Sequence, residues 1–139
     1  MPPTYRASVT SLLSLADARF VSLTTFRRSG ERVSTPVWVA RDGEALVVLT
    51  PAGSGKVERL RRDPRVELAP CGRFGTVEDG VVAVAGTAEV RESRADVDRA
   101  RATIRRHYPI ESRVVLGVER VIERLRGRPR TERLALLIT

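Results

Sequence analysis

The chain has very little cysteine or histidine: among its 139 residues, Cys71 and His107 are the only ones of their kinds. No disulfide can form within the chain, which suits a reducing cytoplasm. A structural zinc site takes about four such ligands, so the sequence excludes one. No apolar run approaches the roughly 20 residues that span a membrane, and the N-terminus lacks the pattern of a signal peptide. We therefore expect a cytoplasmic protein with no membrane contact and no metal.

Aromatic residues are also scarce, at 4% of the chain, which is too few for the stacking platforms that bind single-stranded nucleic acids. The net charge is +8, but basic residues alternate with acidic ones, as in Glu58-Arg59 and Glu123-Arg124. We therefore expect no nucleic-acid partner. The positive charge instead favours small anionic ligands.

Lysine is almost missing as well: of the 25 Lys and Arg residues, 24 are arginine and only Lys56 is lysine. Lysine offers a compact ammonium group, whereas arginine offers a planar fork. Two interpretations are open at this point. Lys56 is either a chance surface residue or a position at which a compact cation is needed.

The rest of the composition is that of one globular domain, residues 1–139, with 42% hydrophobic residues. Segments rich in β-branched residues predict six strands, and segments with helical apolar spacing predict helices at the joints. We therefore predict a mainly β fold with flanking helices, a six-stranded antiparallel barrel. The predicted strands are 20–26, 32–40, 45–50, 65–70, 81–91 and 131–138, and the predicted helices are 9–18, 55–62, 93–107 and 112–126.

Proline and glycine predict irregular places in these strands. Pro36 has no backbone N–H, so it predicts an edge, a bulge or a bend where a ligand can approach the backbone. Gly86 predicts a kink in the long strand 81–91. Asp42-Gly43 predicts a hairpin turn before strand 45–50.

The common catalytic motifs are missing. A Ser-His-Asp triad could use only His107, and no Gly-x-Ser-x-Gly motif accompanies it, so a surface or capping histidine is the better interpretation. The segment Gly53-Ser-Gly-Lys56 resembles the end of a Walker loop. However, Thr50 stands where that loop needs glycine, and Val57 stands where it needs Ser or Thr. Cys71 is better interpreted as a packing residue than as a reactive thiol.

One group of polar residues can bind a ligand without any of these motifs. Thr50, Ser54 and Lys56 lie where strand 45–50 ends and helix 55–62 begins. Two hydroxyl groups, an ammonium group and the N–H groups of a helix N-terminus can hold a phosphate. The alternative is a polar loop in which Ser54 caps the helix.

Five short segments occur in an order that resembles a known family. They are Phe20-Val-Ser-Leu-Thr-Thr25, Val33-Ser-Thr-Pro-Val-Trp38, Leu49-Thr50, Gly55-Lys56-Val57 and Leu60-Arg-Arg-Asp-Pro-Arg-Val66. Together they resemble the split β-barrel proteins related to pyridoxamine-phosphate oxidase, the FMN-binding split-barrel type. More narrowly, they resemble the actinobacterial oxidoreductases that depend on the deazaflavin coenzyme F420. The block at residues 60–66 is the most specific part.

This resemblance implies a homodimer with cofactor sites in clefts between the subunits. The residues that it implies along the cofactor ring are Ser34, Thr35, Pro36 and Val37; those around the phosphate are Leu49, Thr50, Ser54 and Lys56; Ala69 and Pro70 approach from the next strand. Many flavin-binding relatives place an arginine shortly before the phosphate lysine. Residues 51–55 contain none, which favours the deazaflavin over FMN.

The activity implied by the resemblance is hydride transfer between reduced F420 and a small organic substrate. An FMN-binding oxidoreductase and a non-catalytic carrier of F420 or flavin are the alternatives. No catalytic residue is assigned, because in such proteins the cofactor carries the chemistry. Trp38 either walls the substrate space or belongs to the core.

Overall fold

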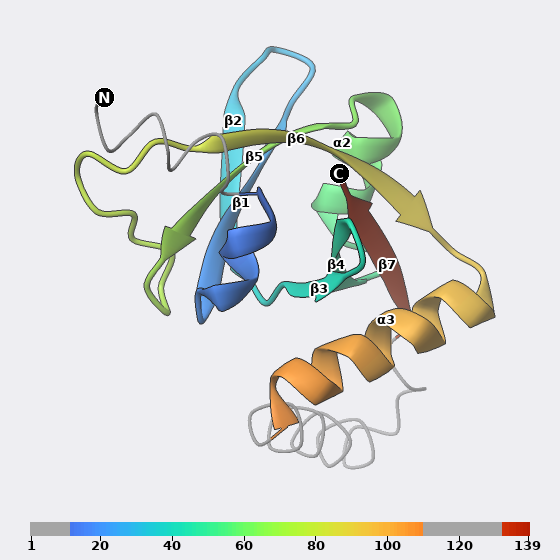
Figure 1. Cartoon of the computed structure of the whole chain (residues 1–139). Helices are drawn as coiled ribbons and strands as arrows, with labels where there is room; N and C mark the ends of the chain where they lie inside the picture. The colour runs from blue at the N-terminus through green and yellow to red at the C-terminus, as the bar shows by residue number, and fades with distance from the viewer. Residues whose placement is uncertain (1–11, 110–131) are drawn as a thin grey trace, which may run out of the picture.

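A seven-stranded antiparallel sheet forms the body of the protein in the computed structural model, which describes residues 12–109 and 132–139 (Figure 1). The strands lie side by side in the order β2-β1-β5-β6-β7-β4-β3. The strands are β1 (Phe20–Phe26), β2 (Arg32–Val37), β3 (Ala40–Asp42), β4 (Ala45–Pro51), β5 (Arg65–Cys71), β6 (Val84–Arg91) and β7 (Arg133–Ile138). The helical elements include the 3-10 helix η1 (Leu15–Asp17) and the helices α2 (Gly55–Arg62) and α3 (Arg94–His107).

The two edge strands of this sheet, β2 and β3, follow each other in the sequence with only Trp38 and Val39 between them. The sheet must therefore curl until its two edges approach, which produces a half-barrel. The prediction of one strand over residues 32–40 is wrong, and the sheet has seven strands rather than six. Both halves of that segment look like strand in the sequence, but the chain passes from one edge of the sheet to the other at Trp38.

Strand β6 joins the two halves of the barrel because it changes partner along its length. Residues 84–87 pair with β5, and residues 88–91 pair with β7. Gly86 lies just before this change, where a Cβ atom would come within 3.2 Å of the carbonyl oxygen of Thr139. The close approach of Thr139 explains why glycine suits this position.

The core of the protein lies inside the curled sheet, where alternate side chains of the strands meet. η1 closes this core: Leu15 is buried in it, and Leu12 and Leu13 pack against it, as predicted. Burying a side chain of this kind stabilises the fold by about 1.5–3 kcal/mol. The fully buried strand residues of this core include Leu23, Leu46, Val48, Leu68, Leu136 and Ile138.

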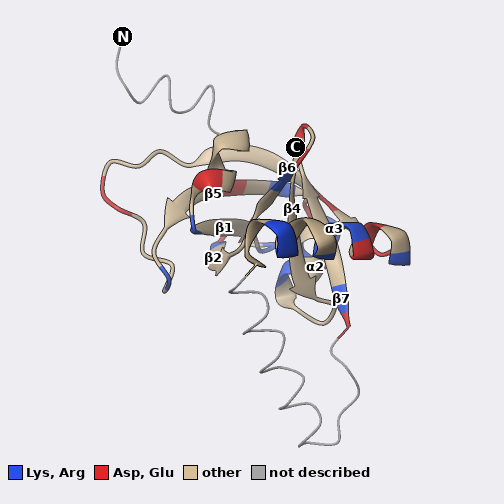
Figure 2. Cartoon of the chain, turned by 60° about the horizontal axis from the view of Figure 1, so that its bottom comes forward, with Lys and Arg blue, Asp and Glu red and all other residues tan. Residues whose placement is uncertain are grey.

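The two helices pack on different parts of the sheet (Figure 1). α2 contacts β1 and β6 and buries Val57 and Leu60. α3 packs on β3, β4 and β7, and begins after Ser93, whose hydroxyl accepts a hydrogen bond from the Asp96 N–H at 3.2 Å. Charged residues of both signs lie along α3 (Figure 2).

The other predicted elements agree with the structure where it describes them. Strands 20–26, 45–50 and 65–70 and helices 55–62 and 93–107 are correct to within one residue. The strand predicted from residue 81 begins only at Val84, and Val81 and Val82 before it are exposed. The helix predicted over 112–126 and residues 9–11 of the first helix lie outside the described residues. In the described ranges, no helix is long and apolar enough to cross a membrane.

Candidate functional site

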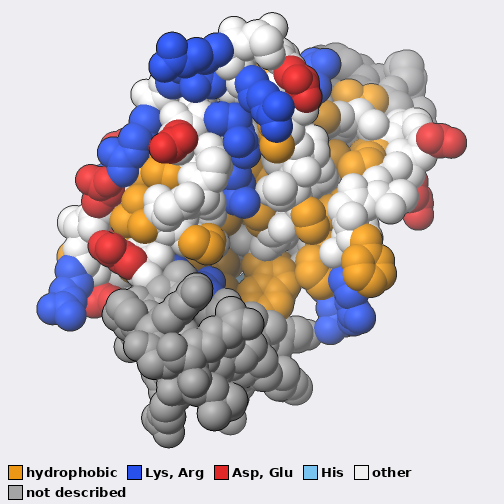
Figure 3. Space-filling model, turned by 180° about the vertical axis from the view of Figure 1, so that it is seen from behind, with side chains coloured by type: hydrophobic (Ala, Val, Ile, Leu, Met, Phe, Trp, Pro, Cys, Tyr) orange, Lys and Arg blue, Asp and Glu red, His pale blue; other side chains and the backbone are white. Residues whose placement is uncertain are grey.

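A cavity of about 340 Å³ lies where β2, β4, α2 and α3 approach one another. Cavities that bind cofactors measure about 300–1,000 Å³ and combine an apolar lining with a few polar groups. On the face seen in Figure 3, Lys and Arg side chains gather above a group of hydrophobic side chains. This combination suits a ligand that has an apolar ring and an anionic group.

The apolar part of the lining comes mainly from β2, β4 and the residue after β2. It consists of Phe20, Pro36, Val37, Trp38, Leu49, Pro51 and Ile104. Pro36 lies on an edge strand, as its missing N–H predicted. The loop after β5 packs on it, since a Cβ atom at Gly75 would lie 3.4 Å from Pro36 Cδ.

Trp38 forms a wall of this cavity and is held from behind by Tyr108. The two rings stack with their centroids 5.0 Å apart. Tyr108 is 4% exposed, and its hydroxyl lies 3.1 Å from the carbonyl oxygen of Val39 and 3.2 Å from that of Arg19. The end of α3 thereby fixes the crossover between β2 and β3. Trp38 packs on a core residue and also lines the cavity.

A pair of hydroxyl groups lies where β4 leads into α2. Thr50 is 1% exposed, and its Oγ1 lies 3.2 Å from Ser54 Oγ. Ser54 occupies the position before α2, but its side chain makes no hydrogen bond to the helix backbone. Ser54 is therefore the N-cap residue by position, as the alternative interpretation had it, but its hydroxyl pairs with Thr50 instead of capping the helix. This side chain accepts no hydrogen bond from the first N–H groups of α2.

Lys56 is the second residue of α2 and lines the cavity together with Thr50. Burial lowers the pKa of Lys56, and the positive charge of Arg59 lowers this pKa further. Arg59 is held nearby by a hydrogen bond from its Nε to Thr25 Oγ1, at 2.7 Å. An ammonium group that has lost water and faces a second cation is stabilised by an anion.

The structure thus gathers several of the predicted site residues in one cavity. Its lining includes Pro36, Val37, Leu49, Thr50 and Lys56, and Ser54 adjoins it through Thr50. These residues come from two strands and one helix.

The remaining predicted residues lie outside the lining. On β2, Ser34 Oγ is hydrogen-bonded to Thr24 Oγ1 at 2.6 Å, and the buried Thr35 Oγ1 has no hydrogen-bond partner among the described residues. Ala69 and Pro70 lie on β5, which β1 separates from β2. Neither residue belongs to the described lining of this cavity.

Sequence reasoning missed most of the cationic lining. Arg101, Ile104 and Arg105 line the cavity from α3, and their helical spacing was the available signal. The other missed residues are Phe20, Pro51, Arg73 and Arg133. These come from segments far apart in the sequence, which only the curled sheet brings together.

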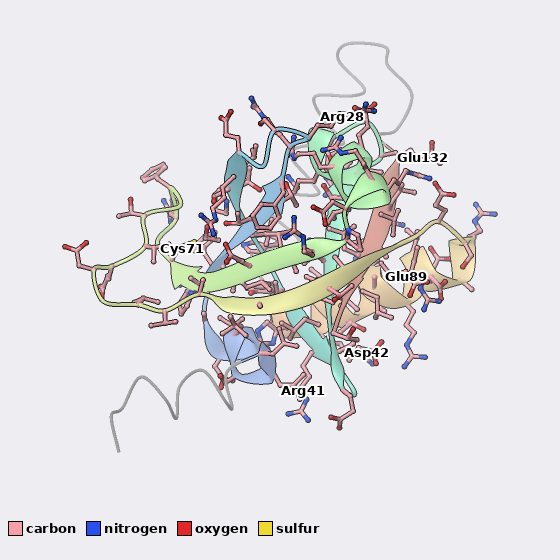
Figure 4. All side chains as sticks on the ribbon, turned by 90° about the horizontal axis from the view of Figure 1, so that it is seen from above. Arg28, Arg41, Asp42, Cys71, Glu89 and Glu132 are labelled. Atoms are coloured by element: carbon pink, nitrogen blue, oxygen red, sulfur yellow. The ribbon has the colours of Figure 1, made fainter. Side chains whose placement is uncertain are left out.

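Cys71 and His107 take no part in this cavity. Cys71 lies at the end of β5, where the long loop leaves the sheet (Figure 4). Burial raises the pKa of its thiol, which supports a packing role rather than a reactive one. His107 ends α3, and its ring meets the edge of Tyr108. Within the described ranges, no group of three or more His, Cys, Asp or Glu residues could hold a metal.

The family of the chain follows from a match to the pyridoxamine 5'-phosphate oxidase model, which covers residues 11–128. The chain belongs to this family. The curled antiparallel sheet is the split barrel expected of a pyridoxamine 5'-phosphate oxidase family member. A search of curated proteins finds no match.

Solved structures of similar proteins confirm the fold. The conserved hypothetical protein Rv2991 of Mycobacterium tuberculosis is 23% identical, with a TM-score of 0.61, and the match covers 100% of this chain and 80% of that one. An F420 reductase is 17% identical, with a TM-score of 0.56, over 92% and 91% of the two chains. A heme binding protein of Mycobacterium smegmatis is 17% identical, with a TM-score of 0.59, over 99% of this chain and 51% of that one. The fold therefore accommodates more than one type of ligand.

Proposed function

We propose that this family member is an oxidoreductase that binds coenzyme F420, a phosphate-bearing deazaflavin, in the cavity between β2, β4 and α2. The observation that carries the proposal is the position of Lys56. The only lysine of the chain lies at the N-terminus of α2 and lines, together with Thr50, a cavity that also has an apolar wall. A helix N-terminus with a nearby cation and hydroxyl groups is suited to a phosphate.

The residues present fit both parts of such a cofactor. Lys56, Thr50 and Ser54 would hold the phosphate, and the lowered pKa of Lys56 shows that its surroundings favour a compensating anion. Pro36 and Val37 of β2, with Leu49 of β4, would lie against the ring. Trp38 would close the space beyond it. This assignment leaves Ser34, Thr35, Ala69 and Pro70 as proposed contacts in the assembled protein.

The bound cofactor would supply the hydride chemistry toward a small organic substrate. The chain itself orients the ring against the edge strand β2 and keeps water from it with Trp38 and Leu49. Trp38 is held for this task by its stack on Tyr108. We assign no proton donor or other catalytic side chain.

An FMN-dependent oxidoreductase is the second candidate, and the match to the pyridoxamine 5'-phosphate oxidase family favours it. Residues 51–55 contain no arginine that could add a second cation before Lys56, which favours F420. A cofactor carrier without turnover is the third candidate. The similarity to an F420 reductase supports the first candidate at the level of the fold.

The proposal includes a homodimer in the cytoplasm, with the cofactor at the subunit interface. β2 is an edge strand on which Ser34 and Pro36 are exposed. The loop beside it carries Phe74, which is 89% exposed. Sedimentation velocity should report twice the mass of one chain, and a monomeric protein that still binds cofactor would contradict this part of the proposal.

Cofactor titration tests the assignment. The purified protein should bind F420 more tightly than FMN, and FMN more tightly than riboflavin, which has no phosphate. Lys56→Met should weaken F420 and FMN by about 1–3 kcal/mol, as expected for loss of a charged hydrogen-bond donor, and leave riboflavin unchanged. Trp38, the only tryptophan, reports binding through its fluorescence.

Arg61→Met is the matched control, because Arg61 is exposed on the same helix and pairs with Glu92 away from the cavity. Equal affinity of Lys56→Met and wild type for F420 and FMN would overturn the phosphate assignment. Binding of F420 without turnover of any acceptor would favour the carrier.

A further inference from the structure

The wall of the cavity that α3 provides has no role in the proposed cofactor site. Arg101, Ile104 and Arg105 line the cavity from this helix. Residues three or four positions apart share one face of a helix, so Ile104 and Arg105 both lie one turn from Arg101. Ile104 is buried, Arg101 is half-buried and Arg105 is exposed. The wall therefore offers an apolar side chain next to two guanidinium groups.

The charged groups that line the cavity are cations. They are Lys56, Arg73, Arg101, Arg105 and Arg133, of which Arg101 and Arg133 also interact with other residues, and no Asp or Glu belongs to the described part of the lining. Asp98, one turn away on α3, lies 3.8 Å from Arg101 and offsets part of its charge. Cations that share a half-enclosed space repel one another more strongly than in water, so anionic ligands are favoured there.

Lys56 belongs to α2, which packs on β1 and β6, whereas Arg105 belongs to α3, which packs on β3, β4 and β7. Ligand atoms that reach α3 must therefore extend past the phosphate site. Between the two helices the lining is apolar, with Leu49 and Trp38.

We infer that the α3 wall is a second anion site, which selects an acceptor substrate bearing a carboxylate next to an apolar or aromatic body. This inference rests on the proposed cofactor site, because it assigns to the substrate the space that the cofactor leaves. The guanidinium fork of Arg105 matches a carboxylate in shape and charge. Ile104 and Trp38 supply the apolar surface for the rest of the substrate.

A pair of probes with the same ring and different charge tests the inference. 2-Naphthoate and 2-naphthylmethanol are titrated by calorimetry into the protein loaded with its cofactor, F420 or FMN. The wild type should prefer the naphthoate, and Arg105→Gln should reduce this preference about tenfold, as expected for loss of one charged hydrogen-bond partner. The affinity of Arg105→Gln for 2-naphthylmethanol should not change.

Arg106→Gln is the matched control, since it removes the same charge at the next position. Arg106 is also exposed on the last turns of α3, but it lines a different cavity together with Arg41 and His107. It should keep the preference for naphthoate. An equal loss in both variants, or no preference in the wild type, would overturn the inference and point to general electrostatics.

Two further results separate this inference from the proposed function. If Arg105→Gln weakens F420 or FMN and leaves naphthoate binding unchanged, the α3 wall binds acidic groups of the cofactor, and the substrate assignment is wrong. If neither cofactor binds the wild type, the proposed function fails. The two probes are then titrated into the wild type, Arg105→Gln and Lys56→Met, all without cofactor. A preference for naphthoate that is lost in Arg105→Gln and kept in Lys56→Met still establishes the second anion site.

Discussion

The indole ring of Trp38 stacks on the phenol ring of Tyr108, with the ring planes inclined by 14°. The contact ties the crossover between the two edge strands to the end of α3, and it forms the back of the cavity wall. Tyr108→Phe keeps the stack but removes the hydroxyl that reaches the carbonyl oxygens of Val39 and Arg19. It should lower the free energy of unfolding by about 1 kcal/mol, measured by urea denaturation.

Tyr108→Leu removes the stack as well and should cost about 0.5–1.5 kcal/mol more than Tyr108→Phe. The fluorescence emission of Trp38 should change in Tyr108→Leu and remain native in Tyr108→Phe. The same emission in all three proteins would show that Tyr108 does not position the indole ring.

Gly86 should not tolerate a side chain. A Cβ atom there would lie 3.2 Å from the carbonyl oxygen of Thr139. Two backbone hydrogen bonds of 2.9 Å, one donated by each residue, join Thr139 to Thr87. Because Thr139 cannot move away without breaking these bonds, Gly86→Ala should destabilise the protein by about 1 kcal/mol or more. Gly53→Ala is the control, since nothing lies within 4 Å of its Cβ position, and its unfolding midpoint should stay near the native value. If the unfolding midpoint of Gly86→Ala equals that of the wild type, the C-terminal strand moves to accommodate the added methyl group.

The pKa of Lys56 predicts how phosphate binding depends on pH. Burial and Arg59 lower this pKa from its ordinary value, so in the unliganded protein Lys56 loses its proton at a lower pH than a free lysine does. Only the protonated amine attracts phosphate, so affinity for FMN or F420 should fall as the pH rises through the lowered pKa. Riboflavin, titrated over the same range, should not show this fall. Lys56→Met should remove the difference between the two ligands, and its persistence in that variant would assign the titration to another group.

A salt bridge between Asp42 and Arg99 joins α3 to β3. Arg99 Nε lies 2.7 Å from one carboxylate oxygen of Asp42, and its NH2 group lies 2.8 Å from the other. The hydrogen bond from Arg99 lowers the pKa of Asp42, whose place beside Arg41 on β3 is seen in Figure 4. With the folded pKa below the unfolded one, the stabilisation is complete above the unfolded pKa and is lost as the pH falls through the folded pKa.

Asp42→Asn should therefore be slightly less stable than wild type at neutral pH and equally stable in acid. The urea midpoints of the two proteins, measured between neutral and strongly acidic pH, should converge. High salt should also reduce the difference, because the pair is partly exposed. Glu44→Gln serves as a control for loss of one nearby acid, since Glu44 forms no ion pair among the described residues. A difference that does not depend on pH would show that Asp42 acts through packing.

Much of the fold could be predicted because its signals are local. β-Branched and other apolar residues marked β1, β4 and β5, and of the edge, bulge or bend that Pro36 predicted, the structure has an edge strand. The missed break at Trp38 and the missing side-chain cap at Ser54 share one cause. Each depends on a partner chosen in three dimensions: β4 becomes the neighbour of β3, and the Ser54 hydroxyl pairs with Thr50 rather than accepting a hydrogen bond from the N–H groups of the helix.

The residues of the candidate site also fall into two groups: those that the sequence marked and those that it did not. Lys56 stood out in the sequence as the only lysine, and the segment around Pro36 was one of the five that carried the resemblance to the family. Arg73, Arg105 and Arg133 could not be distinguished from the other arginines, because nothing local marks which side chains share a cavity.

The sequence alone thus determined the alternation of strands and helices, the membership of the family and the lysine at the start of α2. Only the tertiary structure decided that β2 and β3 are opposite edges of one curled sheet, and that cations from α2, α3, β7 and the loop after β5 surround the same space. The physical reason is that strand and helix preferences depend on neighbouring residues, whereas the closure of a sheet and the charge of a cavity depend on residues that meet only after folding.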